Sequence, residues 1–341
     1  MKYLSGAPLA LIFHVSLSLV SFCAPTHLSA AEMRPLPQMN AALATAPLWQ
    51  STSAEHVYGF PDVRPNKKGS LTLSAETLRF SGKSGDVSIP RSSVTAVSAG
   101  NQRVELWGLG GRILRMTIPD GGGLAAAAVM HHRVDMLTVE FNDNHGGNHG
   151  AVFFLPANEA DRALENFALT RSAPQRVSDT ACHNGAVDPR SVLVTAPNWD
   201  RAEVPAAYRA LVYEHAIDRL RHAKEAMHVY RDGEAGGNGA CPQYVIHISI
   251  AAFKQGSSVQ RAVLGPVGMF VGTTQMVFDV TYTDASGRLN VSEQIKATMR
   301  GESESTNVAD HVASSLAKHY AAALKNANKS NPAKTTYTPA S

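Results

Sequence analysis

Apolar and polar residues alternate along much of this chain, in short segments separated by turn-forming residues. The clearest segments carry Leu71, Leu73, Leu78 and Phe80, and others cover 136–141 and 151–155. Alternation at every second position places the apolar side chains on one face of a β-sheet. A helix is predicted to begin at Asn158, because Ala160, Leu164 and Phe167 follow at helical spacing. The pattern predicts a small rolled antiparallel β domain with a C-terminal helix over residues 69–171.

A different order of elements follows residue 190. A strand at 191–195 precedes an apolar helical stripe at 208–227, then three alternating segments, and a final helix from Asn307. This order predicts a β-α-β-β-β-α domain of sheet plus helices over 191–326. The whole chain is therefore assigned to the α+β class.

Three segments lack this periodicity. Residues 32–68 are rich in Pro, Ala and polar residues and predict an irregular leader segment. Residues 172–190 predict a linker between the two domains, and residues 327–341 predict a disordered tail.

The N-terminus has the features of a secretory signal peptide. A basic residue precedes an apolar run that ends at Phe22, and small residues follow at 29–31. We expect a signal peptide over 1–31, cleavage after Ala31, and a periplasmic or secreted protein. Cys23 leaves lipidation open as an alternative, but the bulky Phe22 stands where a lipidation motif has a small residue. The run is too short to span a bilayer, so we expect no transmembrane helix in the mature chain.

Cleavage at that site leaves two cysteines, Cys182 and Cys241, in an oxidising compartment. A disulfide between them would close a loop of about 60 residues and stabilise the fold by about 4 kcal/mol. A pair of reactive thiols is the alternative. The C-x-x-C spacing of redox catalysts is absent, so a structural disulfide is favoured.

The charge balance excludes nucleic acid as a partner. The chain has 31 Lys and Arg against 28 Asp and Glu, a net charge of +3. No block of basic residues is interleaved with aromatic residues. Electrostatic capture of a polyanion needs more positive charge than this.

Asp143, His145 and His149 form the candidate metal site, because imidazole and carboxylate are zinc ligands. The pair Gly146-Gly147 between them is typical of a flexible turn. The alternative is therefore a simple hairpin turn between two strands. No cofactor is predicted from any other motif.

A Gly-rich apolar stretch is the candidate surface for a protein partner or a membrane. Its members are Arg261, Gly265, Gly268, Phe270 and Gly272. Glycine permits close backbone approach, and exposed apolar residues mark interaction sites. A buried connection between strands is the alternative. A second small and apolar stretch covers 121–130 and is interpreted as a long loop or short helix over the first domain's core, with membrane insertion as the alternative.

Catalytic motifs are absent from the sequence: there is no Gly-x-Ser-x-Gly elbow and no His-Glu-x-x-His pair. Glu293 falls on an apolar face, where a carboxylate is a candidate acid, is paired with an Arg such as Arg261, or lies at the end of the sheet. The histidines of the long helix are interpreted as surface residues or as residues that flank its apolar stripe. They are His215, His222 and His228.

The first domain contains a spaced pattern followed by a closing strand pair and a helix. The pattern comprises Gly69-x-Leu71-x-Leu73, Leu78-x-Phe80, and Ile89-Pro90 leading into Val94. With this pattern, residues 66–171 resemble a bacterial pleckstrin-homology-like (GRAM-like) domain. The resemblance implies a binding or scaffolding fold and does not specify a ligand.

The second domain contains another set of spaced residues. They are Tyr244-Val245-Ile246, Phe253, Gly256, Arg261, Gly265, Gly268 and Asp284-x-x-Gly287. With these, residues 190–326 resemble the bacterial envelope family called domain of unknown function 4410. The resemblance implies an exported α+β domain and supplies no activity, substrate or catalytic residue.

Together these features predict an exported, non-enzymatic binding or scaffold protein of the bacterial cell envelope. Its expected partner is an envelope protein or a lipid surface. One alternative is a lipid- or membrane-surface-binding protein that uses the Gly-rich apolar loops. The other is a hydrolase with an unrecognised site.

Overall fold

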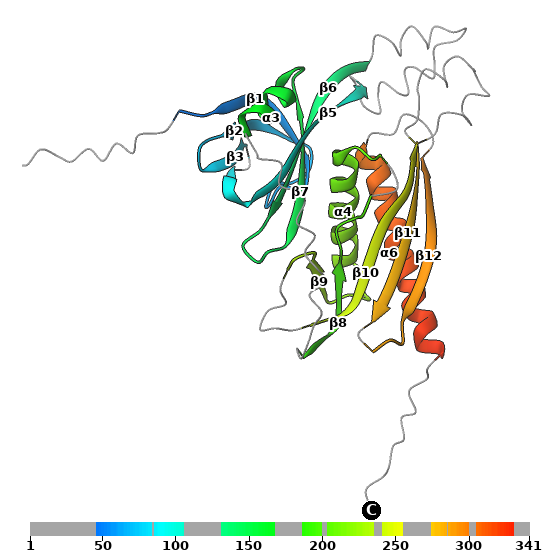
Figure 1. Ribbon diagram of the computed structural model, residues 1–341. Helices are drawn as coiled ribbons and strands as arrows, with labels where there is room; N and C mark the ends of the chain where they lie inside the picture. The colour runs from blue at the N-terminus through cyan, green and yellow to red at the C-terminus, as the bar shows by residue number, and fades with distance from the viewer. Residues whose placement is uncertain are drawn as a thin grey trace, which may run out of the picture. The chain divides into compact units, whose positions relative to one another are not determined.

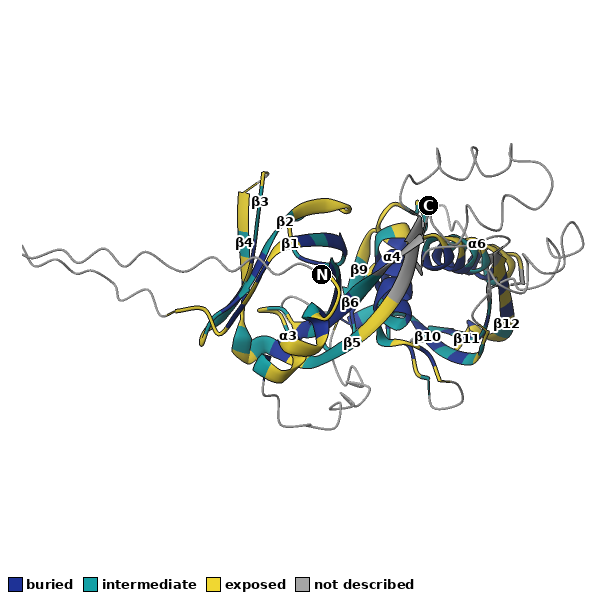
Figure 2. Ribbon diagram, turned by 90° about the horizontal axis from the view of Figure 1, so that it is seen from above, coloured by how far each residue is buried: buried dark blue, intermediate teal, exposed yellow. Residues whose placement is uncertain are grey.

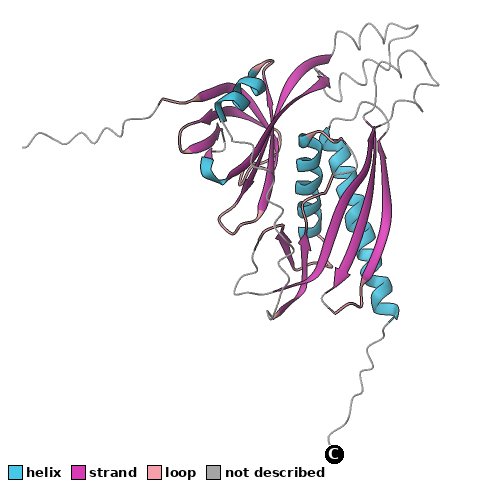
Figure 3. Cartoon of the chain, in the orientation of Figure 1, coloured by secondary structure: helices cyan, strands magenta, loops and turns pink. Residues whose placement is uncertain are grey.

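The computed structural model describes residues 46–83, 85–105, 131–167, 186–199, 203–234, 241–254, 274–284, 286–299 and 305–330. The described residues all belong to one compact unit. Strands and helices are both present in this unit (Figure 3), so the α+β class is confirmed. No helix in the described ranges is long and apolar enough to cross a membrane.

The first half of the unit is a seven-stranded antiparallel sheet (Figure 1). Its strands are β1 (Trp49–Tyr58), β2 (Lys67–Leu73), β3 (Thr77–Gly82), β4 (Gly85–Pro90), β5 (Val94–Glu105), β6 (His131–Asn142) and β7 (Asn148–Leu155). They lie in the order β4-β3-β2-β1-β7-β6-β5. A 3-10 turn, η1 (Arg91–Ser93), joins β4 to β5, and α3 (Glu159–Phe167) follows β7. Because β1 pairs with both β2 and β7, the first and last strands meet in the middle of the sheet.

Alternate side chains of these strands form a core. Leu71, Leu73, Leu78 and Phe80, which the sequence places on one face, are all buried. Removing an aliphatic or aromatic side chain of this size from water contributes about 1.5–3 kcal/mol. Ala160, Ala163 and Phe167 of α3 belong to the same core.

The expectation of an irregular leader over 32–68 is wrong for its second half. Residues 49–58 form β1, and β2 begins at Lys67. The buried positions of β1 include Ser51, Ala54 and His56, which are small or polar, and a bulge interrupts the register after Ser51. These residues conceal the apolar alternation by which a strand is recognised. Residues 32–45 lie outside the described ranges.

The second half is a five-stranded sheet covered on one face by two helices. Its strands are β8 (Val187–Val194), β9 (His228–Arg231), β10 (Cys241–Lys254), β11 (Thr274–Asp284) and β12 (Asn290–Met299), and its helices are α4 (Ala206–Arg221) and α6 (Ser305–Ser330). The order is β12-β11-β10-β8-β9, and β8 runs parallel to both of its neighbours. Ile246, Ile248 and Ile250 of β10 alternate with less buried residues and pack with both helices in one cluster. Figure 2 shows α4 and α6 along the same side of β10, β11 and β12.

Two predicted boundaries and one omitted strand in this half need correction. The linker over 172–190 is too long, since β8 begins at Val187; residues 172–185 lie outside the described ranges. The predicted order also omits β9. The apolar helical spacing continues as far as Met227, whereas α4 ends at Arg221, so the predicted helix reached the start of β9 and hid it. The disordered tail does not begin at 327, because α6 continues to Ser330 and Ala327 packs against the core.

Helix α4 is buried around most of its circumference. It contacts α6 and β9 as well as β6 and β7 of the first sheet. Val57, Met136 and Val152 from the first sheet belong to the same apolar cluster as Leu211 and Ile217 of α4. The two sheets therefore share part of one core through this helix.

Candidate functional site

Glu214 of α4 and Arg231 of β9 form a buried, bidentate ion pair. Two Arg231 nitrogens donate to the two carboxylate oxygens at 2.8 and 2.7 Å. Only 4% and 5% of the two side chains is exposed. Glu214 also accepts the backbone N–H of Gly150 at 2.9 Å, and Arg231 donates to the carbonyl of Asn148 at 3.0 Å. We use the name "joint" for Glu214, Arg231 and the residues of the β6–β7 hairpin that contact them.

The hairpin between β6 and β7 contributes the rest of the joint. Asp143 Oδ1 accepts the backbone N–H groups of His145 and Gly147, both at 2.8 Å. Its Oδ2 lies 3.1 Å from His149 Nε2, and the His149 ring stacks on Phe141 at 5.0 Å. The hairpin interpretation of this segment is therefore confirmed.

The structure brings Asp143 and His149 together but leaves His145 outside. His145 is exposed and contacts Asp143 through its backbone, so the three side chains do not converge. Among the described residues no group of three or more His, Cys, Asp or Glu is arranged to hold a metal ion. The oxygens of Asp143 are occupied by hydrogen-bond donors instead.

The electrostatics of the joint follow from burial and its opposite charges. Burial opposes ionisation of Asp143, but hydrogen bonds from His149, His145 and Gly147 outweigh it and lower its pKa. Burial and the nearby Arg231 lower the pKa of His149 below 6.5. The pKa of Arg231 is raised because Glu214 outweighs the effect of burial. These features suit a structural contact between the hairpin and α4.

His215 is buried, so the interpretation of this histidine as a surface residue is wrong. It is 9% exposed, its ring stacks on Tyr58 at 4.0 Å, and its Nδ1 lies 3.6 Å from Asp310. The helix face that carries it is covered by the first sheet, which local sequence does not reveal. His222 and His228 have side chains 79% and 60% exposed, so their interpretation is confirmed.

Glu293 contacts a histidine. Its Oε2 lies 3.0 Å from His319 Nδ1 of α6. Burial raises the pKa of Tyr282, and the negative charge of the neighbouring Glu293 carboxylate raises that pKa further. Arg261, the expected partner, lies outside the described residues. The pair couples β12 to α6.

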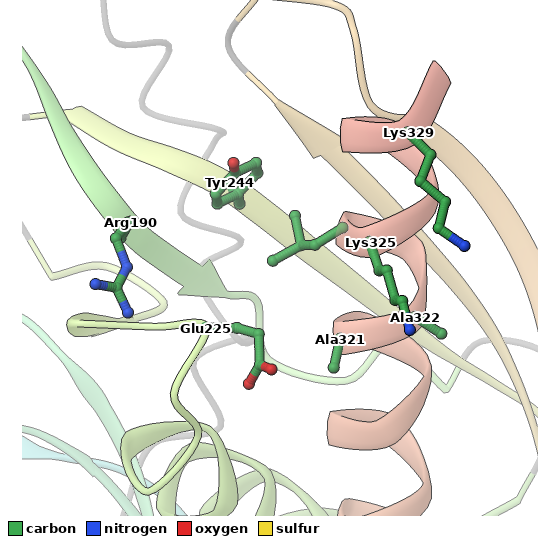
Figure 4. A pocket seen from close by; sticks show the side chains of 8 residues that line it. Arg190, Glu225, Tyr244, Ala321, Ala322, Lys325 and Lys329 are labelled. Carbon is green, nitrogen blue, oxygen red and sulfur yellow. The ribbon is translucent and has the colours of Figure 1, made fainter. Parts of the chain in front are cut away.

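An open pocket of about 730 Å³ lies where β8, β10 and α6 meet. Its lining residues are Arg190, Glu225, Tyr244, Ala321, Ala322, Leu324, Lys325 and Lys329. Figure 4 shows Arg190 on one side and the two lysines of α6 on the other, with Tyr244 and Glu225 between them in this view. We call this site the basic pocket.

The cations of the basic pocket come from distant parts of the chain. Arg190 is on β8, and its guanidinium donates to the carbonyl of Lys224. Lys325 and Lys329 are four residues apart on α6 and share one side of the helix. The spacing of the lysines can be seen in the sequence. Their proximity to Arg190 depends on the packing of α6 against the sheet.

The other candidate residues fall largely outside the described ranges. This applies to Arg261, Gly265, Gly268, Phe270 and Gly272, to residues 121–130, and to Cys23, Ala31 and Cys182. Cys241 is buried at the beginning of β10. The disulfide and the Gly-rich interaction loop stay predictions.

Comparisons with known proteins do not assign this chain to a family. No family model and no curated protein matches it. Among solved structures, the PelC dodecamer from Paraburkholderia phytofirmans is 16% identical, with a TM-score of 0.27 over 40% of this chain and 93% of that chain. A Xanthomonas campestris protein of the family DUF330 is 9% identical, with a TM-score of 0.29 over 43% of this chain and 94% of that chain. At these TM-scores the likeness carries no argument about this chain.

Proposed function

We propose that this chain is an exported, non-enzymatic binding or scaffold protein of the bacterial cell envelope, and that the basic pocket is its binding site. The pocket carries the proposal. Its side chains are supplied by β8, β10 and α6 and by Glu225 just before β9, so the site is built mainly on regular elements. Its volume of about 730 Å³ lies within the range of ligand pockets.

Export is supported by the basic, apolar and small-residue segments of the first 31 residues. The test is expression of the whole chain in a bacterium, followed by fractionation and mass measurement of the mature protein. We expect a periplasmic or secreted protein that begins at Glu32. A cytoplasmic protein that retains Met1 would contradict export, and an acylated Cys23 would replace the soluble form by a lipid-anchored one.

The finer fold assignments are also proposals. The pairing of β1 with β7 and the helix that closes the first sheet are compatible with the proposed pleckstrin-homology-like domain. The order of strands and helices in the second sheet supports the proposed relation to domain of unknown function 4410 less specifically. Neither proposal supplies a substrate.

Binding is tested by purification from envelope fractions. The tagged full chain is compared with a triple variant, Arg190→Asn with Lys325→Gln and Lys329→Gln, and with the control Lys318→Gln, an exposed residue of the same helix. We expect a ligand or partner that accompanies the wild type and the control but not the triple variant. Equal recovery with all three proteins would contradict a role for the pocket.

The two alternative functions have their own readouts. Flotation of the purified protein with vesicles, unchanged by the triple variant, would favour a membrane-surface protein that uses the Gly-rich loops. Turnover in a broad screen of ester, amide and glycoside substrates would favour a hydrolase. Either result would replace the proposed function.

A further inference from the structure

We propose that the basic pocket binds a small amphipathic anion, a carboxylate or phosphate group attached to an apolar chain. This inference rests on the proposed binding function and specifies its ligand class. It follows from the charge, the local conformation and the apolar wall of the pocket.

Charge in the pocket is unbalanced. Arg190, Lys325 and Lys329 line it together with one carboxylate, that of Glu225, which leaves a formal excess of two positive charges. None of the three cations is ion-paired with a carboxylate within the described residues. A concave site lined by one sign of charge concentrates ligands of the opposite sign. The ligand is therefore an anion.

Two features of the pocket oppose local stability. Lys325 and Lys329 are like charges at a spacing of four residues on a helix, and such pairs repel each other. Arg190 has a φ of 60°, a left-handed conformation that is uncommon for a residue with a long side chain. The C-terminal end of α6 favours Lys329 in its last turn. The conformation of Arg190 falls where the register of β8 with β10 shifts, and Gln243 Oε1 accepts the backbone N–H of Arg190 at 2.6 Å. An anion bound between β8 and α6 would interact favourably with all three cations.

The rest of the lining is apolar. Ala321, Ala322 and Leu324 of α6 and the ring of Tyr244 form this wall. Figure 4 labels the two alanines and Tyr244. Alanine at two of these positions leaves space beside the helix, and contact with the wall removes apolar surface of a ligand from water. Inorganic phosphate would satisfy the cations but not this wall. An uncharged alcohol would contact the wall but not the cations.

Isothermal titration calorimetry of the mature full chain tests the ligand class with four probes: decanoate, decyl phosphate, decanol and inorganic phosphate. All are kept below micellar concentrations. We expect decanoate or decyl phosphate, or both, to bind at least about tenfold more tightly than decanol and inorganic phosphate, because each of the latter two lacks one half of the interaction. Comparison of decanoate with decyl phosphate identifies the preferred head group.

Variants then place the binding in the pocket. Arg190→Asn removes the charge while asparagine tolerates the left-handed conformation, and Ala322→Trp fills the space beside the wall. Each should weaken binding by about tenfold or more. Lys318→Gln and Lys318→Trp, at an exposed position of α6, should bind as the wild type does. Thermal melts monitored by circular dichroism verify that every variant is folded.

A last arm separates a free amphiphile from a lipid in a bilayer. Vesicles of phosphatidylglycerol that compete with the preferred soluble probe would identify a membrane lipid head group as its source, and vesicles without effect would identify a free amphiphile. Absence of binding by both charged probes, or binding unaffected by Arg190→Asn and Ala322→Trp, would overturn the inference. If the envelope ligand is still lost from the triple variant, the binding function stands and only the ligand class is wrong.

Discussion

Glu214 is a carboxylate on a helix face that is otherwise packed with apolar residues. It is tolerated there because three donors reach its two oxygens: two from Arg231 and one from the backbone of Gly150. An ion pair of this kind adds little stability over apolar residues of similar size, but an unpaired member is costly. Both members also contact the hairpin, because the Gly150 N–H donates to Glu214 and the Asn148 carbonyl accepts from Arg231.

Replacement of Glu214 by glutamine should lower the free energy of unfolding by about 3–5 kcal/mol, because Arg231 stays charged and loses its partner. Urea denaturation of the wild type and Glu214→Gln measures the difference. The double variant Glu214→Leu with Arg231→Met removes both charges and should lose less than the single variant. A double variant as unstable as Glu214→Gln, or less stable, would contradict the coupling of the pair.

His56 is a fully buried residue whose protonation state affects stability. Its Nε2 accepts the backbone N–H of Phe60 at 2.9 Å, and Nδ1 lies 3.2 Å from the carbonyl of Arg64. Phe80 and Phe153 pack against the ring. The ring is therefore neutral with its proton on Nδ1, and burial lowers its pKa from 6.5.

Since the folded pKa of His56 is below 6.5, the unfolded chain takes up the proton first as the pH falls. The stability due to the neutral ring is complete above pH 6.5 and is lost as the pH falls below that value. We expect the free energy of unfolding to fall between pH 7 and pH 5, by at most about 1.4 kcal/mol per pH unit for this proton. His56→Gln should reduce the slope, and His222→Gln, at an exposed position, should not. An unchanged slope in His56→Gln would contradict the assignment.

At the scale of elements, α4 and β7 approach closely because glycine occupies position 150. A Cβ atom at Gly150 would lie 2.6 Å from the Cβ of Ala210 on α4. The carbonyl of Gly150 is also close to Gly59, whose φ is 87°. Larger side chains at these positions would force the hairpin and the helix apart.

Gly150→Ala should therefore lower the free energy of unfolding by about 1–3 kcal/mol through overpacking. Gly100→Ala on β5 is the matched control, since its nearest neighbour would be Met136 Cε at 3.9 Å. We expect the control to change stability by less than about 0.5 kcal/mol. Guanidinium denaturation of both variants measures the effect, and equal losses would argue against a close contact at Gly150.

For the whole molecule, the cluster shared by Val57, Val152 and Leu211 should make the two sheets unfold together. Native-state hydrogen exchange measures this. The most protected amides of β3 and β11 should give the same free energy of opening, and Gly150→Ala should lower both equally. Values that differ between the sheets by more than about 2 kcal/mol would show two separate folding units.

The predicted disulfide between Cys182 and Cys241 also acts on the whole molecule. The mature protein, denatured without reductant, should show no free thiol, and reduction should lower the free energy of unfolding by about 4 kcal/mol. Thiol titration and urea denaturation with and without reductant measure the two effects. Two reactive thiols in the unreduced protein would contradict the pairing.

Local periodicity by itself determined the α+β class, the two strands β6 and β7 that form the hairpin, and the existence of α4 and α6. These elements have regular apolar spacing, and that spacing is a property of neighbouring residues. It failed for β1, whose buried positions include Ser51 and His56, and for β9, which consists of four residues paired with distant β8.

Only the tertiary structure decided what the polar residues do. In the sequence, Asp143 and His149 suggested a metal site. In the structure they belong to a structural contact that also contains Glu214 and Arg231, which are distant in sequence. Arg190 is distant in sequence from the lysines of α6, and the packing of α6 brings all three to one pocket. Side chains that are remote along the chain interact only after folding, so their joint role is absent from local sequence patterns.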